Sequence, residues 1–128
     1  FWEDTVTQPE HEMFEMAKRI VAAKKIVFTK TLDHSVWPNT ILAKGNLTEE
    51  VNKLKQQNGK DLIVYGGSSF VAALIKKKLI DEFHFFVNPV VLGKGVSVFE
   101  QLDDPQQLQL VKSVTYNSGI VLMQYVPR

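Results

Sequence analysis

Two short stretches of this sequence combine residue types that can hold phosphate groups. In the first, the apolar run Leu62–Tyr65 is followed at once by Gly66-Gly67 and then by Ser68-Ser69, where a helical pattern begins. A glycine pair lets the backbone turn sharply and lets a ligand come close, because no Cβ stands in the way. The free N–H groups of a helix's first turn attract phosphate, and serine hydroxyls add further donors. The stretch therefore predicts a site for an anionic group, such as a pyrophosphate.

The second stretch, Phe28-Thr29-Lys30-Thr31, ends another predicted strand with two hydroxyls and a cation. Thr29, Thr31 and Lys30 could hold a second phosphate, and the Phe28 ring could pack beside a base. Ligands of open α/β sheets bind at the carboxyl ends of the strands, so both stretches are expected at one edge of a parallel sheet. Each also has a purely structural interpretation, as a glycine turn between strand and helix and as a solvated turn with a surface lysine.

Hydrophobic periodicity predicts the elements that would position these stretches. Helices are expected from a capping box at Thr7 to about Ala23, from a Thr48 cap to a left-handed stop at Asn58-Gly59, and over Phe70–Lys78. Strands are expected over residues 26–29, 40–43, 62–65, 83–92 and 96–99. Residues 108–116 and 120–126 alternate apolar and polar around Asn117-Ser118-Gly119, which predicts a closing antiparallel hairpin.

This order of elements predicts an α/β fold. Alternating helices and strands are typical of a central sheet with helices on both faces. That sheet is expected to be mixed, mostly parallel with a C-terminal antiparallel hairpin. At 128 residues, with 45% hydrophobic and 23% charged residues, the chain is expected to form a single domain.

Composition also excludes several kinds of site. The formal net charge of +1 does not favour nucleic acid as a partner. The chain has no cysteine, hence no disulfide, no thiolate nucleophile and no cysteine zinc site. No apolar run approaches the roughly 20 residues of a membrane span, and a cytoplasmic protein is expected. His11, His34 and His84 show no metal-ligand spacing, so no metal is expected, and Asp81-Glu82 is interpreted as a capping or solvated pair.

Three segments of the chain resemble the dihydrofolate reductase-like superfamily. They are KKIVFTKTL, DLIVYGGSSFVAALI and LIDEFHFFVNPVVLGKGVSVF, of which the third is the most specific. The resemblance is strongest to the reductase domain at the C-terminus of the riboflavin-biosynthesis deaminase–reductase, and to the stand-alone bacterial proteins built like it. It covers nearly the whole chain, and it implies an oxidoreductase with NADPH as hydride donor, in many relatives a homodimer.

The resemblance also implies roles for individual residues. Gly66 and Gly67, which many relatives join by a cis peptide, match the pair beside the nicotinamide ribose and the pyrophosphate, and the serines after them match donors to the pyrophosphate. Thr29 and Lys30 match the turn that holds the adenosine 2′-phosphate, and Phe28 matches a residue near the adenine. The expected cofactor-binding residues are Phe28, Thr29, Lys30, Thr31, Tyr65, Gly66, Gly67, Ser68 and Ser69.

Three departures from the family pattern limit what the resemblance implies. The family's N-terminal strand and helix, which form the substrate wall and bear the acid, are not visible, so an N-terminally incomplete domain is expected and no catalytic residue is assigned. Tyr65 stands where riboflavin-pathway reductases usually place Glu, which weakens the match to a pyrimidine substrate. Val71 stands where dihydrofolate reductases have an aromatic residue, which disfavours folate.

The expected function is NADPH-dependent hydride transfer to a small heterocyclic substrate, pterin-like or pyrimidine-like. It would resemble that of 5-amino-6-(5-phosphoribosylamino)uracil reductase or of dihydrofolate reductase. The alternative is a non-catalytic NADP(H)-binding protein, or a structural dimer protein, of the same fold. The expected partners are a small-molecule substrate and a second copy of the chain, with neither nucleic acid nor a membrane.

Overall fold

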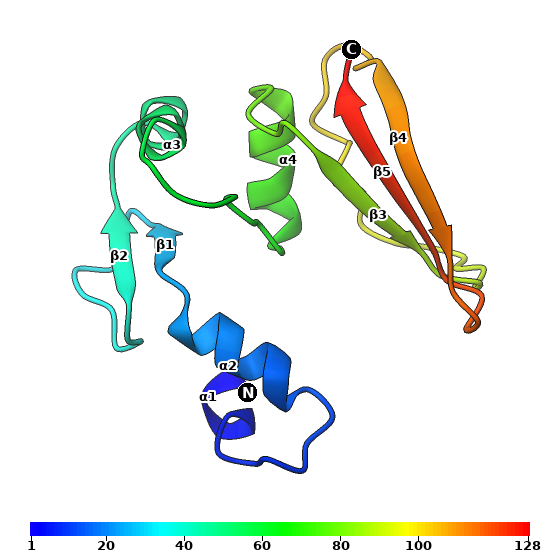
Figure 1. Cartoon of the computed structure of the whole chain (residues 1–128). Coiled ribbons are helices and arrows are strands. Elements are labelled where there is room, and N and C mark those ends of the chain that lie inside the picture. Colours follow the sequence, from blue (N-terminus) through cyan, green and yellow to red (C-terminus); the bar gives the residue numbers. More distant parts are fainter. The chain divides into compact units, whose positions relative to one another are not determined.

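The structure, a computed structural model, describes residues 1–128, and Figure 1 labels its elements. The chain divides into two compact units, Phe1–Gln56 and Gln57–Arg128. The first unit contains α1 (Trp2–Thr5), α2 (Phe14–Ala22), β1 (Lys25–Phe28), β2 (Thr40–Ala43) and α3 (Leu47–Lys55). The second contains α4 (Ser68–Lys76), β3 (Phe83–Val87), β4 (Leu108–Thr115) and β5 (Val121–Pro127). None of the helices is long and apolar enough to cross a membrane.

The first helix of the predicted pattern begins later than expected. α2 begins after Met13, which makes no side-chain cap, and the predicted capping box does not form. The Thr7 hydroxyl instead donates to the Asp4 carbonyl at 2.7 Å, so it serves the end of α1, a helix that the sequence pattern did not predict. The predicted end near Ala23 is confirmed, and Lys25 Nζ donates to the carbonyls of Ile20, Val21 and Ala23 there.

A two-stranded parallel sheet follows α2. β1 pairs with β2 in a register that runs from Lys25 opposite Thr40 to Phe28 opposite Ala43. Both strands lie close to the predicted ranges. The amide of Thr29 continues the ladder by one bond, because it donates to the Ala43 carbonyl at 3.1 Å. The chain therefore leaves β1 at Thr29, where the sequence predicted a functional turn.

Helix α3 is capped by Asn46 rather than by the predicted Thr48. Asn46 Oδ1 accepts from the amides of Thr48 (3.0 Å) and Glu49 (3.4 Å), which satisfies two of the N–H groups that a helix start leaves free. The predicted left-handed stop at Asn58-Gly59 is also wrong. The helix ends before Gln56, which is right-handed, and neither Asn58 nor Gly59 has a positive φ.

Substituting Asn46→Ala is expected to lower the free energy of unfolding by about 1 kcal/mol, because two helix amides lose their acceptor. Thr48→Ala is the matched control, since its hydroxyl does not cap the helix, and it should change stability much less. Urea denaturation followed by circular dichroism measures both. Equal losses in the two variants would show that Asn46 does not cap α3.

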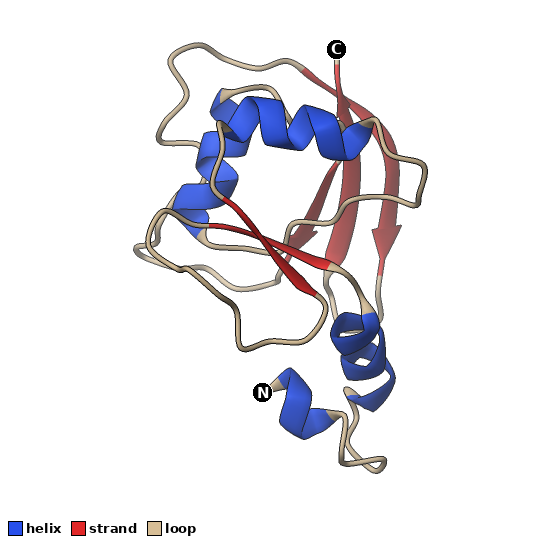
Figure 2. Ribbon diagram, turned by 90° about the vertical axis from the view of Figure 1, so that its left-hand side faces the viewer, coloured by secondary structure: helices blue, strands red, loops and turns tan.

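The second unit places α4 against a three-stranded antiparallel sheet, in the order β3-β5-β4 (Figures 1 and 2). The predicted hairpin is confirmed: β4 and β5 pair around a tight turn in which Gly119 has a φ of +85°. The unit's buried side chains come from α4, from the turn that follows it and from β3, and are Ala72, Leu74, Ile75, Leu79 and Phe83.

Helix α4 begins at Ser68, so the prediction that the two serines open the helix is confirmed, two residues before the periodic run predicted from Phe70. The helix ends in an uncommon way. After the last helical turn Lys78 has a φ of +54°, a conformation that usually selects glycine. The amide of Leu79 donates to the Leu74 carbonyl (3.0 Å) and that of Lys78 to the Ile75 carbonyl (2.9 Å). These are the two bonds of a Schellman motif, and buried Leu79 supplies its apolar contact. Packing of Leu79 thus holds a lysine in a left-handed conformation.

Several predicted strands do not form. The run Leu62–Tyr65 forms no strand, and Ile63 and Tyr65 are each 75% exposed. The strand that begins at Phe83 ends at Val87 rather than at residue 92, and residues 98–101 form a turn instead of a strand. A strand exists only where a neighbour accepts and donates its backbone bonds, and apolar composition does not supply that neighbour. The α/β class is confirmed, whereas a single, mostly parallel central sheet is not, since the strands form two separate sheets.

Candidate functional site

The glycine corner, which we define as Tyr65–Ser69, lies in the second unit directly before α4. Gly67 is the N-cap of this helix, with φ 70° and ψ 98°, and no side chain caps the helix. The first bond along the helix runs from the amide of Val71 to the Gly67 carbonyl at 3.0 Å. The N-terminal end of α4 is therefore a helix start without a side-chain acceptor, the arrangement that favours an anion.

The space around the two glycines is open. A Cβ placed on Gly66 would meet no atom within 4 Å, and one on Gly67 would meet only Phe70 Cβ, at 3.6 Å. Gly67 is needed for its backbone, because a φ of +70° strains any residue that has a Cβ. Gly66 has no such constraint. The peptide bond between them is trans, so the cis peptide implied by the resemblance is absent.

The threonine turn, which we define as Phe28–Thr31, lies in the first unit at the end of β1. The Thr29 hydroxyl oxygen accepts from the amides of Thr31 (3.2 Å) and Leu32 (3.1 Å), so this side chain shapes the turn. Because the oxygen is an acceptor in both bonds, the hydroxyl hydrogen remains available to a ligand. Phe28 is partly buried in β1.

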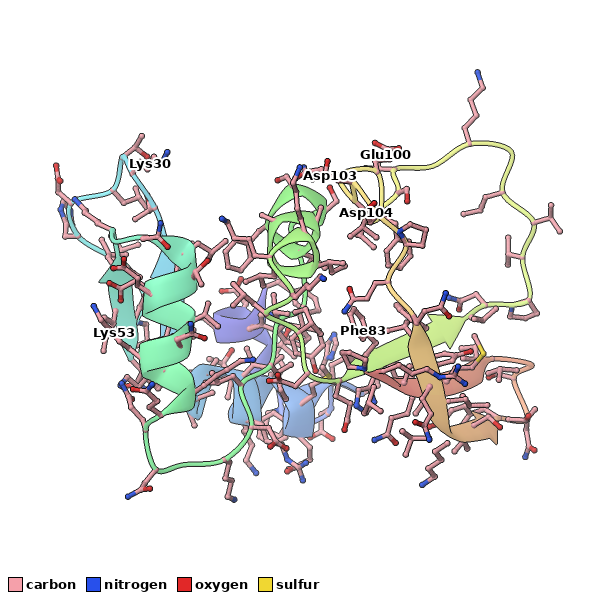
Figure 3. All side chains as sticks on the ribbon, turned by 90° about the horizontal axis from the view of Figure 1, so that it is seen from above. Lys30, Lys53, Phe83, Glu100, Asp103 and Asp104 are labelled. Atoms are coloured by element: carbon pink, nitrogen blue, oxygen red, sulfur yellow. The ribbon has the colours of Figure 1, made fainter.

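Lys30 is the unpaired cation of this loop. Figure 3 shows it at the far end of the loop that follows β1. The neighbouring Lys44 is neutralised by Asp33, with Nζ and Oδ1 2.8 Å apart, whereas Lys30 is exposed and has no carboxylate partner. The turn therefore offers one free positive charge beside a hydroxyl donor.

The structure thus brings the predicted residues together in two groups, Tyr65–Ser69 in the second unit and Phe28–Thr31 in the first. Two hollows, of about 450 and 280 Å³, contain none of them. Both hollows include residues next to the start of β1, such as Lys24 and Lys25, at the opposite end of that strand from the threonine turn. No three His, Asp or Glu side chains cluster as a metal site would require.

One polar cluster was not anticipated from the sequence. His84 Nε2 contacts Glu82 Oε1, and hydrogen bonds from His84 first and from Gln124 second lower the pKa of Glu82. The prediction that His84 lies on a sheet face is confirmed. Asp81-Glu82 was interpreted as a capping or solvated pair, but Glu82 also bonds with two side chains of the sheet. The sequence could not indicate these bonds, because they depend on the strand register that sets His84 opposite Gln124.

Two solved structures share the fold of this chain. The crystal structure of a putative riboflavin biosynthesis protein from Shewanella sp. PV-4 matches 92% of the chain and 71% of its own length, with a TM-score of 0.73 and 21% identity. That of a pyrimidine reductase-like protein from Corynebacterium diphtheriae matches 80% of the chain and 49% of its own length, with a TM-score of 0.58 and 17% identity. At such identities the likeness shows the fold alone.

Two proteins of Bacillus subtilis (strain 168) are similar in sequence, and both are described as uncharacterized. YyaP is 38% identical over 111 residues, which make up 87% of this chain and 58% of YyaP. YwjB is 34% identical over 70 residues, which make up 55% of this chain and 40% of YwjB. The chain therefore spans about half the length of the curated relatives it matches.

The family model of the RibD C-terminal domain matches residues 2–122 and so extends over both compact units. This match confirms the resemblance to this reductase domain that was predicted from three segments of the sequence. The protein therefore belongs to the RibD C-terminal domain family, and it shares the fold of riboflavin-biosynthesis and pyrimidine reductase-like proteins.

Proposed function

We propose that the protein is an NADPH-dependent reductase that passes hydride to a small heterocyclic substrate. Family membership supports a reductase, because the matched structures are named for riboflavin biosynthesis and pyrimidine reduction. The observation that carries the proposal is the glycine corner, an open and uncapped helix start that follows two glycines. Such a corner fits a diphosphate, whose oxygens need N–H donors and close backbone approach.

Each residue of the glycine corner has a distinct task in this proposal. Gly66 leaves room for the diphosphate and the nicotinamide ribose. Gly67 adopts the positive φ that directs the first N–H groups of α4 toward the diphosphate. Ser68 and Ser69, both exposed, donate from their amides and hydroxyls. Tyr65, also exposed, would lie against the same cofactor.

The threonine turn fits a phosphate monoester, such as the 2′-phosphate of NADPH. Lys30 supplies a charge with no competing carboxylate, and Thr29 supplies a hydroxyl donor that its own turn holds in place. Thr31 fixes the shape of the turn through its amide. Phe28 presents an aromatic ring for the adenine. These residues therefore select NADPH over NADH, which has no 2′-phosphate.

When bound, NADPH supplies the hydride, and the protein's residues position the cofactor and exclude competing reactions. We assign no proton donor within the chain. The substrate is defined only as pterin-like or pyrimidine-like, because the chain departs from both patterns. Tyr65 replaces the Glu of riboflavin-pathway reductases, and Val71 replaces the aromatic residue of dihydrofolate reductases. Tyr65 also favours the second candidate, a non-catalytic NADP(H)-binding or structural dimer protein, since a phenol does not replace a carboxylate.

Titration of the full-length protein with NADPH, followed by cofactor fluorescence or calorimetry, tests the proposal. We expect saturable binding that is tighter for NADPH than for NADH, and NADPH oxidation when pyrimidine or pterin compounds are added. Binding without oxidation of any such compound would support the non-catalytic candidate. Absence of NADPH binding would contradict both the reductase and the cofactor-binding alternative.

A further inference from the structure

The dipeptide Asn58-Gly59 does not end α3 as the sequence predicted, and it lies in the exposed loop between α3 and α4. The amides of Asn58, Gly59 and Lys60 donate to no acceptor, and no hydrogen bond holds the Asn58 side chain. A Cβ on Gly59 would meet no atom within 4 Å. The backbone around Asn58 can therefore rotate without breaking a hydrogen bond.

An asparagine followed by glycine carries both partners of a ring-closing reaction. The carbonyl carbon of the Asn58 side chain, Cγ, can be attacked by the main-chain nitrogen of Gly59, which closes a five-membered ring. Glycine leaves this nitrogen open to approach, because it has no Cβ. The attack also requires a nitrogen that is not engaged in a hydrogen bond and a side-chain amide that can turn toward it. Asn58-Gly59 meets all of these conditions.

The fold restrains three of the five other asparagines of the chain. Asn39 Nδ2 donates to two carbonyls at the end of α2, both at 3.4 Å. Asn46 caps α3, so its side-chain oxygen is bonded to two helix amides. Asn52 lies inside α3, where the next amide is bonded along the helix. In each case ring closure would first have to break these bonds.

The two remaining asparagines lack an open nitrogen after them. Asn88 is followed by Pro89, whose nitrogen carries no hydrogen. Asn117 is followed by Ser118, whose Cβ crowds the nitrogen, and it lies in the hairpin turn that two backbone hydrogen bonds close. Asn117 is therefore the nearest competitor of Asn58, and it serves below as the internal reference.

We propose that Asn58 is a site of spontaneous modification, at which the side-chain amide is converted into a carboxylate through a cyclic imide. The nitrogen of Gly59 loses its proton and forms a bond to Cγ of Asn58, and the C–N bond of the side-chain amide breaks to release ammonia. Water then opens the ring at either of its two carbonyls, which gives aspartate or isoaspartate. The net reaction consumes one water and releases one ammonia, and nothing is oxidised or reduced.

The modification changes both the charge and the length of the chain near the start of the second unit, Gln57–Arg128. The formal net charge of +1 falls to zero, because a neutral amide becomes a carboxylate. The isoaspartyl product also adds one methylene to the main chain between α3 and α4. An aged sample of the protein should therefore contain an acidic form whose peptide over residues 56–60 is altered.

Incubation of the full chain at physiological temperature, in water enriched in heavy oxygen, tests the proposal. Peptide mapping by mass spectrometry should find aspartate and isoaspartate at Asn58, each carrying heavy oxygen. Both should form at least about tenfold faster than any product at Asn117. The rate should rise with pH, because the attacking nitrogen must lose its proton. Isoelectric focusing should show the acidic form appearing at the same rate.

Two variants address the two reacting groups. Gly59→Leu should slow the reaction at Asn58 about tenfold or more, because the leucine side chain crowds the nitrogen. Asn58→Gln should stop it, since closure would need a larger ring. Gly66→Leu is the matched control, an open glycine of the same loop that no asparagine precedes, and it should leave the rate at Asn58 unchanged. Circular dichroism confirms that each variant is folded.

The freedom of this loop also predicts that folding gives Asn58 no protection. Its rate in the folded chain should lie within about twofold of its rate in urea, whereas the rates at Asn46 and Asn117 should rise on unfolding. Strong protection of Asn58 in the folded chain would overturn the proposal. So would equal rates at Asn58 and Asn117, aspartate formed without isoaspartate, or an unchanged rate in Gly59→Leu. None of these readouts involves NADPH, so they are independent of the proposed function.

Discussion

Replacing Gly66 by leucine is expected to weaken NADPH binding by at least about tenfold, while the folded chain remains as stable as the wild type. The two effects separate because of the geometry at this position. A Cβ on Gly66 meets no protein atom within 4 Å, and its backbone is outside the left-handed region. Within the proposed function, the space that the leucine would fill is the space through which the diphosphate approaches the start of α4.

Stability in the Gly66→Leu variant should be unchanged or slightly higher. A residue other than glycine restricts the unfolded chain, which stabilises a protein by about 0.4–1 kcal/mol where the native backbone accepts the side chain. Thermal unfolding monitored by circular dichroism measures this, and calorimetric titration with NADPH measures the affinity. The two measurements together distinguish a blocked site from a damaged fold.

Gly59→Leu is the control for this experiment. Gly59 belongs to the same unit, lies in an exposed loop, and likewise has no atom within 4 Å of a Cβ and no positive φ. It should change neither stability nor affinity by much. Unaltered NADPH binding in Gly66→Leu would remove the glycine corner from the cofactor site. Equal losses of affinity in both variants would point to a general effect of leucine on the chain.

The second large effect is expected at Lys30. Substituting Lys30→Met should lower NADPH affinity about tenfold or more and leave NADH affinity unchanged, because a hydrogen bond to a charged group contributes about 1.5–3 kcal/mol. Methionine keeps the length of the side chain and removes only its charge. Lys30 has no ion pair within the chain, so its loss should not alter folding.

Lys24→Met is the matched control, since Lys24 is an exposed lysine of the same unit just before the start of β1, whereas Lys30 follows its end. Kd values for both nucleotides should be measured at low and at moderate salt, because screening weakens exposed charge interactions. A parallel loss of NADPH and NADH affinity in Lys30→Met would contradict the assignment of the 2′-phosphate to this turn. So would an equal loss of NADPH affinity in Lys24→Met.

The sequence by itself determined those features that depend on neighbouring residues. The hairpin forms around Asn117–Gly119 because a glycine supplies the positive φ that the turn needs and the strands beside it alternate apolar and polar. The glycine corner forms because Gly67 permits a left-handed turn directly before a helix pattern. The family could also be recognised, because its motifs are short runs of contiguous residues.

Tertiary structure decided what depends on a partner distant in the sequence. Leu62–Tyr65 has the composition of a strand yet pairs with no neighbour, and the strands form two sheets rather than one. Thr7 bonds back to Asp4 instead of capping α2, although its spacing to Glu10 matched a capping box. Glu82 bonds with both His84 and Gln124 because the register between β3 and β5 sets those two residues opposite each other. Backbone and side-chain bonds each have several possible acceptors along a chain, and only the folded arrangement selects among them.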